Sequence, residues 1–199
     1  MAKIIVLDAG HGQFGNPYPT FDGCYEGTQN YKLSLKLKRE LEVRGYEVLL
    51  TRPEITDDPE LAVRGRMAGE HGACFFLSLH SNAPGNDVPP DIYPTIRGTE
   101  IYYSLTDKEG NIPLARALND AVVCVMETDD RGVKIREYPG VPEDDYYGVI
   151  RASAKSGCRR AMLLEHGFHT NLQDAAKLLD DAILERLAVA EAEVIARFV

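Results

Sequence analysis

The sequence lacks three features that would place it in particular classes of protein. It has no apolar run long enough to span a bilayer, so we expect no membrane partner. Its four cysteines (Cys24, Cys74, Cys124 and Cys158) form no CxxC pair, which argues for reduced thiols and against a disulfide scaffold or structural zinc knuckle. Basic residues are few and scattered, 22 against 31 acidic ones for a net charge of -9. That balance argues against nucleic acid as a partner, because phosphate binding depends on clustered Lys and Arg.

The start of the chain also lacks the pattern of a secretory signal. Met-Ala-Lys is followed by an apolar stretch that is too short and too soon acidic for a signal peptide, so we expect synthesis and folding in the cytoplasm. With 199 residues and 44% hydrophobic content, the chain is expected to form one domain over residues 1–199.

What the sequence does contain begins with a strand-like run that ends at a histidine. Residues 4–9 are mostly aliphatic, which predicts a strand buried on both faces, and His11 follows between Gly10 and Gly12. Glycines permit a sharp turn there, so His11 is expected at the carboxyl edge of the sheet, where open α/β proteins keep their sites. A solvated turn histidine is the alternative for this residue taken alone.

Apolar periodicity along the rest of the chain alternates between strand and helix. Strands are predicted at 46–51, 74–79, 99–104, 132–136 and 160–164, with 99–104 at a sheet edge. Helices are predicted at 26–44, 59–72 and 112–126, with one long terminal helix capped by Asn171 and reaching Phe198. Loops are expected at 13–25, 83–97 and 138–147. The predicted fold is a single α/β domain, a twisted, mostly parallel sheet of about six strands flanked by helices.

Polar residues follow the buried strands in a repeated way. His80 and Glu165 end two strands as His11 ends the first, and Glu26 lies near the start of a helix. Because the carboxyl ends of parallel strands share one edge, these four side chains are candidates to converge. Two imidazoles and one carboxylate are typical of a catalytic zinc site with an open fourth position, while a further carboxylate can move protons.

Each of these residues also has a purely structural explanation. Glu26 is favourable at a helix N-terminus without any metal. Glu165 could instead form an ion pair with Arg159 or Arg160, and His80 could bond a backbone carbonyl. The metal interpretation rests on their joint occurrence at equivalent positions.

Seven segments resemble the zinc-dependent N-acetylmuramoyl-L-alanine amidases, the amidase type 3 family, which cleave peptidoglycan between the sugar and its stem peptide. They occur in the family order: LDAGHG (7–12), Glu26 with Asn30, LAVR (61–64), SLHSNA (78–83), GTEIYY (98–103), RGVK (131–134) and LEHGFHTN (164–171). Each is weak alone, but together they cover nearly the whole chain. The chain departs from the family at Gly69, where an asparagine is common, and in the long 83–97 loop.

The resemblance implies roles for individual residues. His11, Glu26 and His80 would hold zinc (Zn2+), Glu165 would be the catalytic carboxylate, and the substrate would be a peptidoglycan glycopeptide. Candidate substrate contacts are Asn82, His166, His169, Tyr93 and Tyr146, although strand alternation turns His166 away from Glu165. Asp8 is a candidate to orient a ligand imidazole.

Two other functions remain open beside the amidase. One is a zinc peptidase that cuts within the stem peptide, and the other is a wall-recognition module that keeps the fold without turnover. The start of the chain fits a phage endolysin, acting on the cell wall after release, better than an exported autolysin. The sequence does not determine the oligomeric state.

Overall fold

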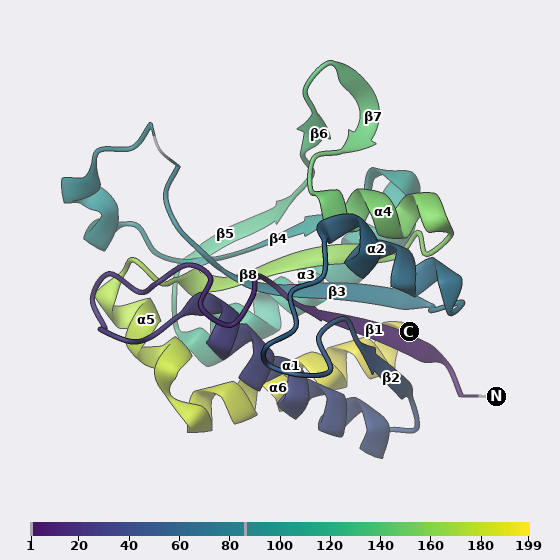
Figure 1. Ribbon diagram of the computed structural model, residues 1–199, viewed down its shortest axis with the longest axis horizontal. Coiled ribbons are helices and arrows are strands. Elements are labelled where there is room, and N and C mark those ends of the chain that lie inside the picture. Colours follow the sequence, from purple (N-terminus) through teal and green to yellow (C-terminus); the bar gives the residue numbers. More distant parts are fainter. Residues whose placement is uncertain (1, 86) are drawn as a thin grey trace.

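A six-stranded sheet with the order β2-β1-β3-β8-β4-β5 forms the centre of the molecule (Figure 1). The structure is a computed structural model that describes residues 2–85 and 87–199. The strands are β1 (Ile4–Ala9), β2 (Glu47–Leu50), β3 (Phe75–Asn82), β4 (Thr99–Tyr103), β5 (Asp130–Lys134) and β8 (Ala161–Phe168). Parallel ladders join β2, β1, β3 and β8, whereas β4 pairs antiparallel with β8 and parallel with β5. The predicted α/β class with a mostly parallel sheet is confirmed.

Helices cover both faces of this sheet (Figure 1). One layer contains α1 (Glu26–Val43), α3 (Lys108–Met126), α5 (Leu172–Leu179) and α6 (Asp181–Phe198), and the other contains α2 (Leu61–Glu70) and α4 (Gly148–Ser156). Strand alternation divides the core accordingly: Leu77 and Leu164 pack on the α1 side, and Phe76 and Leu163 on the α2 side. By the same alternation, His80 and Glu165 share the α2 face of the sheet.

Several predicted elements differ from the structure. The terminal helix is two helices, because Asp180 has an extended backbone (φ -81, ψ 115) and its side chain accepts a hydrogen bond from the Ala182 amide, which caps α6. The 99–104 strand is not an edge, since β4 lies between β8 and β5. Helix α4 was not predicted. The predicted loop at 138–147 contains most of a hairpin formed by β6 (Glu137–Tyr138) and β7 (Val141–Asp145). The 83–97 loop includes a 3-10 helix, η1 (Pro90–Thr95).

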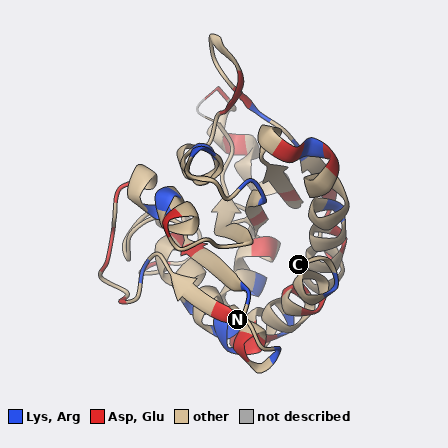
Figure 2. Ribbon diagram, turned by 90° about the vertical axis from the view of Figure 1, so that its right-hand side faces the viewer, with Lys and Arg blue, Asp and Glu red and all other residues tan. Residues whose placement is uncertain are grey.

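Basic and acidic segments are interleaved around the helices (Figure 2). Some of these charges join the helices, as where Lys36 of α1 lies 2.9 Å from the Asp181 carboxylate at the start of α6. Within residues 2–85 and 87–199, none of the helices combines the length and apolar content that crossing a bilayer requires.

Candidate metal centre and active site

Glycines bring the chain segments around His11 into close contact. Gly10 continues the pairing of β1, its amide donating to the Leu79 carbonyl at 3.0 Å. A Cβ on Gly10 would lie 2.3 Å from the His80 ring, and a Cβ on Gly27 would lie 1.8 Å from the carbonyl oxygen of Gly12. Only residues without side chains fit at both places, so these glycines allow β1, β3 and the start of α1 to meet.

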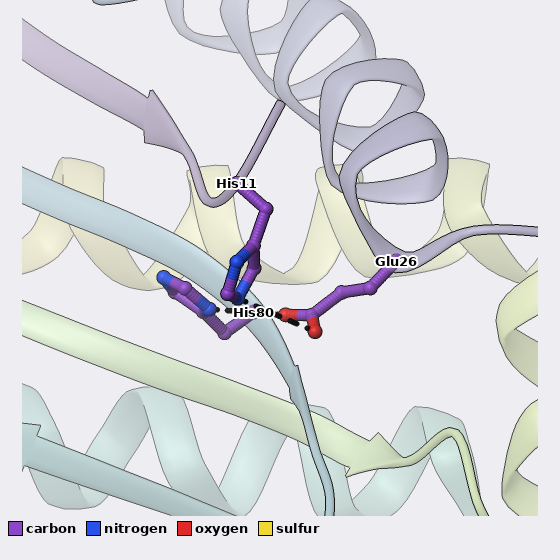
Figure 3. Close-up of side chains that lie close together, drawn as sticks. All are labelled: His11, Glu26 and His80. Atoms are coloured by element: carbon purple, nitrogen blue, oxygen red, sulfur yellow. Dashed lines mark hydrogen bonds and ion pairs between the residues drawn. The ribbon is translucent and has the colours of Figure 1, made fainter. Parts of the chain in front are cut away.

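Glu26 points toward the imidazoles of both His11 and His80, which lie next to each other (Figure 3). Its Oε1 is 3.0 Å from His80 Nδ1 and its Oε2 is 3.4 Å from His11 Nε2. One ligand atom from each of the three residues lies within 4.8 Å of the others. Three elements distant in sequence therefore place two imidazole nitrogens and one carboxylate oxygen around a common point.

The Glu26 carboxylate is buried and fixed by hydrogen bonds to both of its oxygens. Oε1 accepts from the Ser81 amide at 2.9 Å and from Asn30 Nδ2 at 3.2 Å, and Oε2 accepts from Asn16 Nδ2 at 2.8 Å. Burial alone would raise the pKa of Glu26, but the hydrogen bond with His80 and the nearby imidazoles hold this pKa at about 2. The group is therefore ionised at neutral pH, as a metal ligand must be.

The donor set fits zinc better than a hard cation such as magnesium or calcium. Imidazole nitrogens suit zinc, whereas magnesium and calcium prefer sites built from oxygen ligands. Three protein ligands leave one position for water or substrate, the arrangement of catalytic zinc sites. Hydrogen bonds from Asn16, Asn30 and Ser81 supply the outer contacts that orient a ligating carboxylate.

Glu165 lies beside this group, directly paired with His80 across the parallel β3–β8 ladder. Its side chain is buried, and among the described residues its Oε2 finds no hydrogen-bond partner. Burial, against the opposing effect of His80, raises the pKa of Glu165 to about 8. No ion pair with Arg159 or Arg160 occurs among the described residues, so the structural explanation considered for Glu165 does not apply. A buried carboxyl with a free oxygen and a raised pKa can hold or take a proton near neutral pH.

Three of the predicted substrate contacts are occupied by protein partners. Asn82 Nδ2 donates to Glu100 Oε1 at 3.0 Å, so its amide helps to hold a second carboxylate. His169 stacks on Tyr18, and its Nδ1 is 3.7 Å from Glu26 Oε2. His166 is completely buried on the opposite face of the sheet, with Nε2 3.0 Å from Glu191 Oε1 on α6. The structure thus places His169 behind Glu26 and does not bring His166 to the centre.

The two predicted tyrosines lie on different parts of the surface. Tyr93 belongs to η1 in the long loop that extends to the left of the sheet in Figure 1. Tyr146 is 36% exposed at the base of the β6–β7 hairpin and lines a cavity with Tyr147 and Leu61. Leu61 also lines the cavity that contains His11 and His80, so the cavity beside Tyr146 adjoins that of the centre.

Sequence reasoning missed the buried arginine that supports the His11 loop. Arg64 of α2 lies 3.0 Å from the Asp8 carboxylate, and it donates to the Ala9 carbonyl at 2.8 Å and the His11 carbonyl at 3.2 Å. Asp8 also accepts from Ser78 at 2.6 Å, and in the described part of the chain its hydrogen bonds go to no imidazole, which corrects the role considered for it. Arg64 belongs to the LAVR segment, but the residues that it contacts are distant in the sequence, so no local pattern predicts these contacts.

A second buried carboxylate next to Glu165 was also missed. Glu100 of β4 pairs directly with Glu165 across the antiparallel ladder. Its oxygens accept from Tyr102 Oη at 2.9 Å and Arg131 Nε at 2.8 Å, as well as from Lys134 and Asn82. The one signal in the sequence was the charge of Glu100, within a predicted strand whose other residues are uncharged.

Comparisons with known proteins show the family of the chain. A family described as N-acetylmuramoyl-L-alanine amidase matches residues 5–197 of the chain. The sporulation-specific N-acetylmuramoyl-L-alanine amidase of Bacillus subtilis (strain 168) is 30% identical over 193 residues, covering 94% of this chain and 64% of that protein. N-acetylmuramoyl-L-alanine amidase CwlM of Bacillus licheniformis is 29% identical over 202 residues, covering 99% of this chain and 68% of that protein. The chain therefore spans about two thirds of the length of these relatives, 64% and 68%.

A solved structure gives the same result for the fold. The catalytic domain of CwlV, an N-acetylmuramoyl-L-alanine amidase from Bacillus (Paenibacillus) polymyxa var. colistinus, matches with a TM-score of 0.80 at 27% identity. The match covers 98% of this chain and 97% of that domain. The family match over nearly the whole chain, the sequence relatives and the shared fold lead to one conclusion: the chain belongs to the N-acetylmuramoyl-L-alanine amidase family.

Proposed function

We propose that this chain hydrolyses the amide bond between N-acetylmuramic acid and the L-alanine of the peptidoglycan stem peptide. The observation that carries the proposal is the group formed by His11, Glu26 and His80, within 4.8 Å and beside the buried Glu165, in a chain of this family. Action on the bacterial cell wall after release from the cell that makes the protein is part of the same proposal.

Zinc is proposed as the cofactor, held by His11, Glu26 and His80. When bound there, zinc would supply a Lewis acid and lower the pKa of a water molecule. Glu26 contributes a carboxylate that is already ionised, and Asn16, Asn30 and Ser81 keep it aimed between the two imidazoles. Because these three side chains are already held in place, zinc binding requires little further ordering of them.

Glu165 is proposed as the group that moves protons. The free Oε2 of its carboxyl group is available to accept a proton from the attacking water and to pass it to the nitrogen of the leaving alanine. Glu100, held by Arg131 and Lys134, lies on the neighbouring strand and keeps negative charge beside Glu165. That charge raises the pKa of Glu165 and so favours its protonated form, in which it holds the proton between the two transfers.

The test is digestion of purified peptidoglycan by the zinc-loaded protein, followed by mass spectrometry of the released fragments. We expect intact stem peptides with a new amino terminus at L-alanine, together with glycan strands whose lactyl groups carry free carboxylates. A new terminus inside the stem peptide would identify a zinc peptidase instead. Absence of any new terminus, with zinc bound, would leave the non-catalytic wall-recognition module as the function.

A further inference from the structure

A cavity of about 520 Å³ lies beside the candidate active site, on the same face of the sheet as His80 and Glu165. The base of the β6–β7 hairpin and the first turns of α2 and α4 form its walls, with these lining residues: Leu61, Tyr138, Pro139, Tyr146, Tyr147, Gly148 and Arg151. Leu61 also lines the cavity of about 410 Å³ that contains His11 and His80, so the two spaces adjoin.

Tyr147 links this cavity to the Glu165 carboxyl group. Its ring packs 4.7 Å from that of Tyr102, whose hydroxyl donates to Glu100, the residue paired with Glu165 across the sheet. Burial and the nearby Glu165 carboxylate raise the pKa of the Tyr147 hydroxyl, which agrees with this proximity. One wall of the cavity therefore reaches the side of the centre where Glu165 lies.

Arg151 is the only charged residue among the described residues that line the cavity, and its guanidinium is held in place. Its Nη1 donates to the carbonyls of Asp145 and Tyr146, the latter at 3.0 Å, and its plane lies 4.8 Å from the Tyr138 ring centre. Within residues 2–85 and 87–199, its Nε and Nη2 donate to no acceptor and no carboxylate pairs with it. An oriented guanidinium with free donors is the group that recognises carboxylates with most geometric specificity.

The charged side chains that line the neighbouring space are all basic. A neighbouring cavity of about 430 Å³ shares Arg151, Gly148 and Leu61, and its other charged lining residues are Arg66 and Lys155. Lys155 is paired with Asp144 at 2.8 Å and Arg66 with Glu70 at 3.6 Å, so of these three lining cations only Arg151 has no carboxylate partner among the described residues. A cation without a carboxylate partner beside the active site favours an anionic ligand, in a chain whose net charge is -9.

We propose that Arg151 anchors a carboxylate of the stem peptide in this cavity, so that the peptide extends from Glu165 toward the β6–β7 hairpin. The inference rests on the proposed function: a group that protonates the departing alanine nitrogen must lie next to the peptide side of the scissile amide. The acetylated sugars on the other side are neutral, whereas the peptide carries carboxylates beyond its alanine. The faces of Tyr138 and Tyr146 provide apolar surface for the same peptide.

The experiment compares two soluble substrates of the zinc-loaded protein, an N-acetylmuramoyl tripeptide with free carboxylates and the same molecule with every carboxylate converted to a carboxamide. We expect the wild-type KM to be about tenfold lower for the carboxylate form, because a hydrogen bond to a charged group contributes roughly that factor. Arg151→Gln should raise KM about tenfold for the carboxylate form only, with kcat little changed.

The matched control is Arg116→Gln, which removes the same charge from an exposed position on α3, in the other helix layer. It should leave both KM values unchanged. Calorimetry with the free tripeptide and its amide gives a readout without turnover, and wild-type protein should bind the carboxylate form more tightly.

Several results would overturn the inference. Equal KM values and equal calorimetric affinities for the two forms in the wild-type protein would do so without any variant. An equal loss on both substrates in Arg151→Gln would mean that the side chain only supports the hairpin. Hydrolysis without carboxylate preference would refute this inference alone, whereas failure to hydrolyse either substrate or peptidoglycan would refute the proposed function, and calorimetry would still decide the carboxylate site.

Discussion

His80 Nδ1 lies 3.0 Å from Glu26 Oε1, although 54 positions separate the two residues in the chain. The contact exists because α1 begins where β3 ends, and Gly10 leaves room for the His80 ring between β1 and β3. The Ser81 amide, next to His80 on β3, donates to the same carboxylate oxygen. A histidine and a carboxylate held so closely are preorganised either as an ion pair or as two ligands of one metal ion.

Removal of any one of the three candidate ligands is expected to abolish stoichiometric zinc binding. His11→Ala, Glu26→Ala and His80→Ala each leave two donors, too few for a stable catalytic zinc site. Asn30→Ala, which removes one hydrogen bond to Glu26, should lower zinc affinity by about 10–100-fold. Zinc content after dialysis, measured by plasma mass spectrometry, checks the predictions for the ligand variants and for Asn30→Ala. His71→Ala, at the exposed end of α2, is the control, and stoichiometric zinc in His80→Ala would contradict the assignment.

Glu165→Gln is expected to separate zinc binding from hydrolysis. The substitution keeps the shape of the side chain but removes the group that accepts a proton, so the rate should fall by roughly 10²–10⁴-fold. Zinc content should stay close to that of the wild-type protein, because Glu165 lies outside the three-residue ligand group. A rate near that of the wild-type protein would remove Glu165 from the proton-transfer role.

Glu100 should make the stability of the protein depend on acid pH. Burial alone would raise the pKa of Glu100, but Lys134, Arg131 and Tyr102 lower it below the ordinary value of 4.5. Because this pKa is lower in the folded state, the stabilisation is complete above about pH 4.5 and is lost as the pH falls further. The Tm advantage of the wild-type protein over Glu100→Gln should therefore shrink between about pH 5 and 3. A constant difference in Tm over that range would contradict the ion-pair account.

His166 is expected to matter for stability and not for chemistry. Its two ring nitrogens lie 3.0 Å from the His80 carbonyl oxygen and 3.0 Å from Glu191 Oε1, and both side chains are completely buried. His166→Ala leaves the Glu191 carboxylate buried without this partner, which should cost about 3–5 kcal/mol in the free energy of unfolding. Denaturant unfolding measures the loss. The double variant with Glu191→Leu should recover part of it, and no loss in the single variant would refute the pairing.

Gly10→Ala should disturb the metal centre through sterics alone. A Cβ at this position meets the His80 ring at 2.3 Å, so the ring must move from the place where it faces Glu26. We expect a loss of zinc affinity in a protein that still folds. Gly148→Ala is the matched control, because its Cβ would meet the Leu61 side chain at 3.3 Å and Arg151 Nη2 at 3.9 Å, and no backbone atom or ring of the centre is among its three nearest neighbours. Equal zinc affinity in both variants would show that the His80 ring has room to adjust.

The sequence by itself determined the elements whose signal is local. The aliphatic run of β1 and the leucines of α1 at positions 33, 37 and 41 are buried as their periodicity predicts. The convergence of His11, His80 and Glu165 near one edge could also be predicted, because parallel strands of one sheet deliver their carboxyl ends to one edge. The predicted strand ends were too early, since β3 continues to Asn82 and β8 to Phe168, so His80 and Glu165 lie within these strands. These inferences need only the pattern of apolar residues and the rule of strand direction.

The tertiary structure alone decided which polar groups are paired. Glu100 is paired with Arg131 and Lys134, and Arg64 is buried against Asp8, through contacts between residues 31 to 56 positions apart. Arg151 and Lys155 lie on the same helix, yet among the described residues Lys155 pairs with the Asp144 carboxylate whereas Arg151 donates to backbone carbonyls. Local patterns cannot predict such differences, because the energy of a charge depends on its burial and on neighbours that only the packed chain brings together.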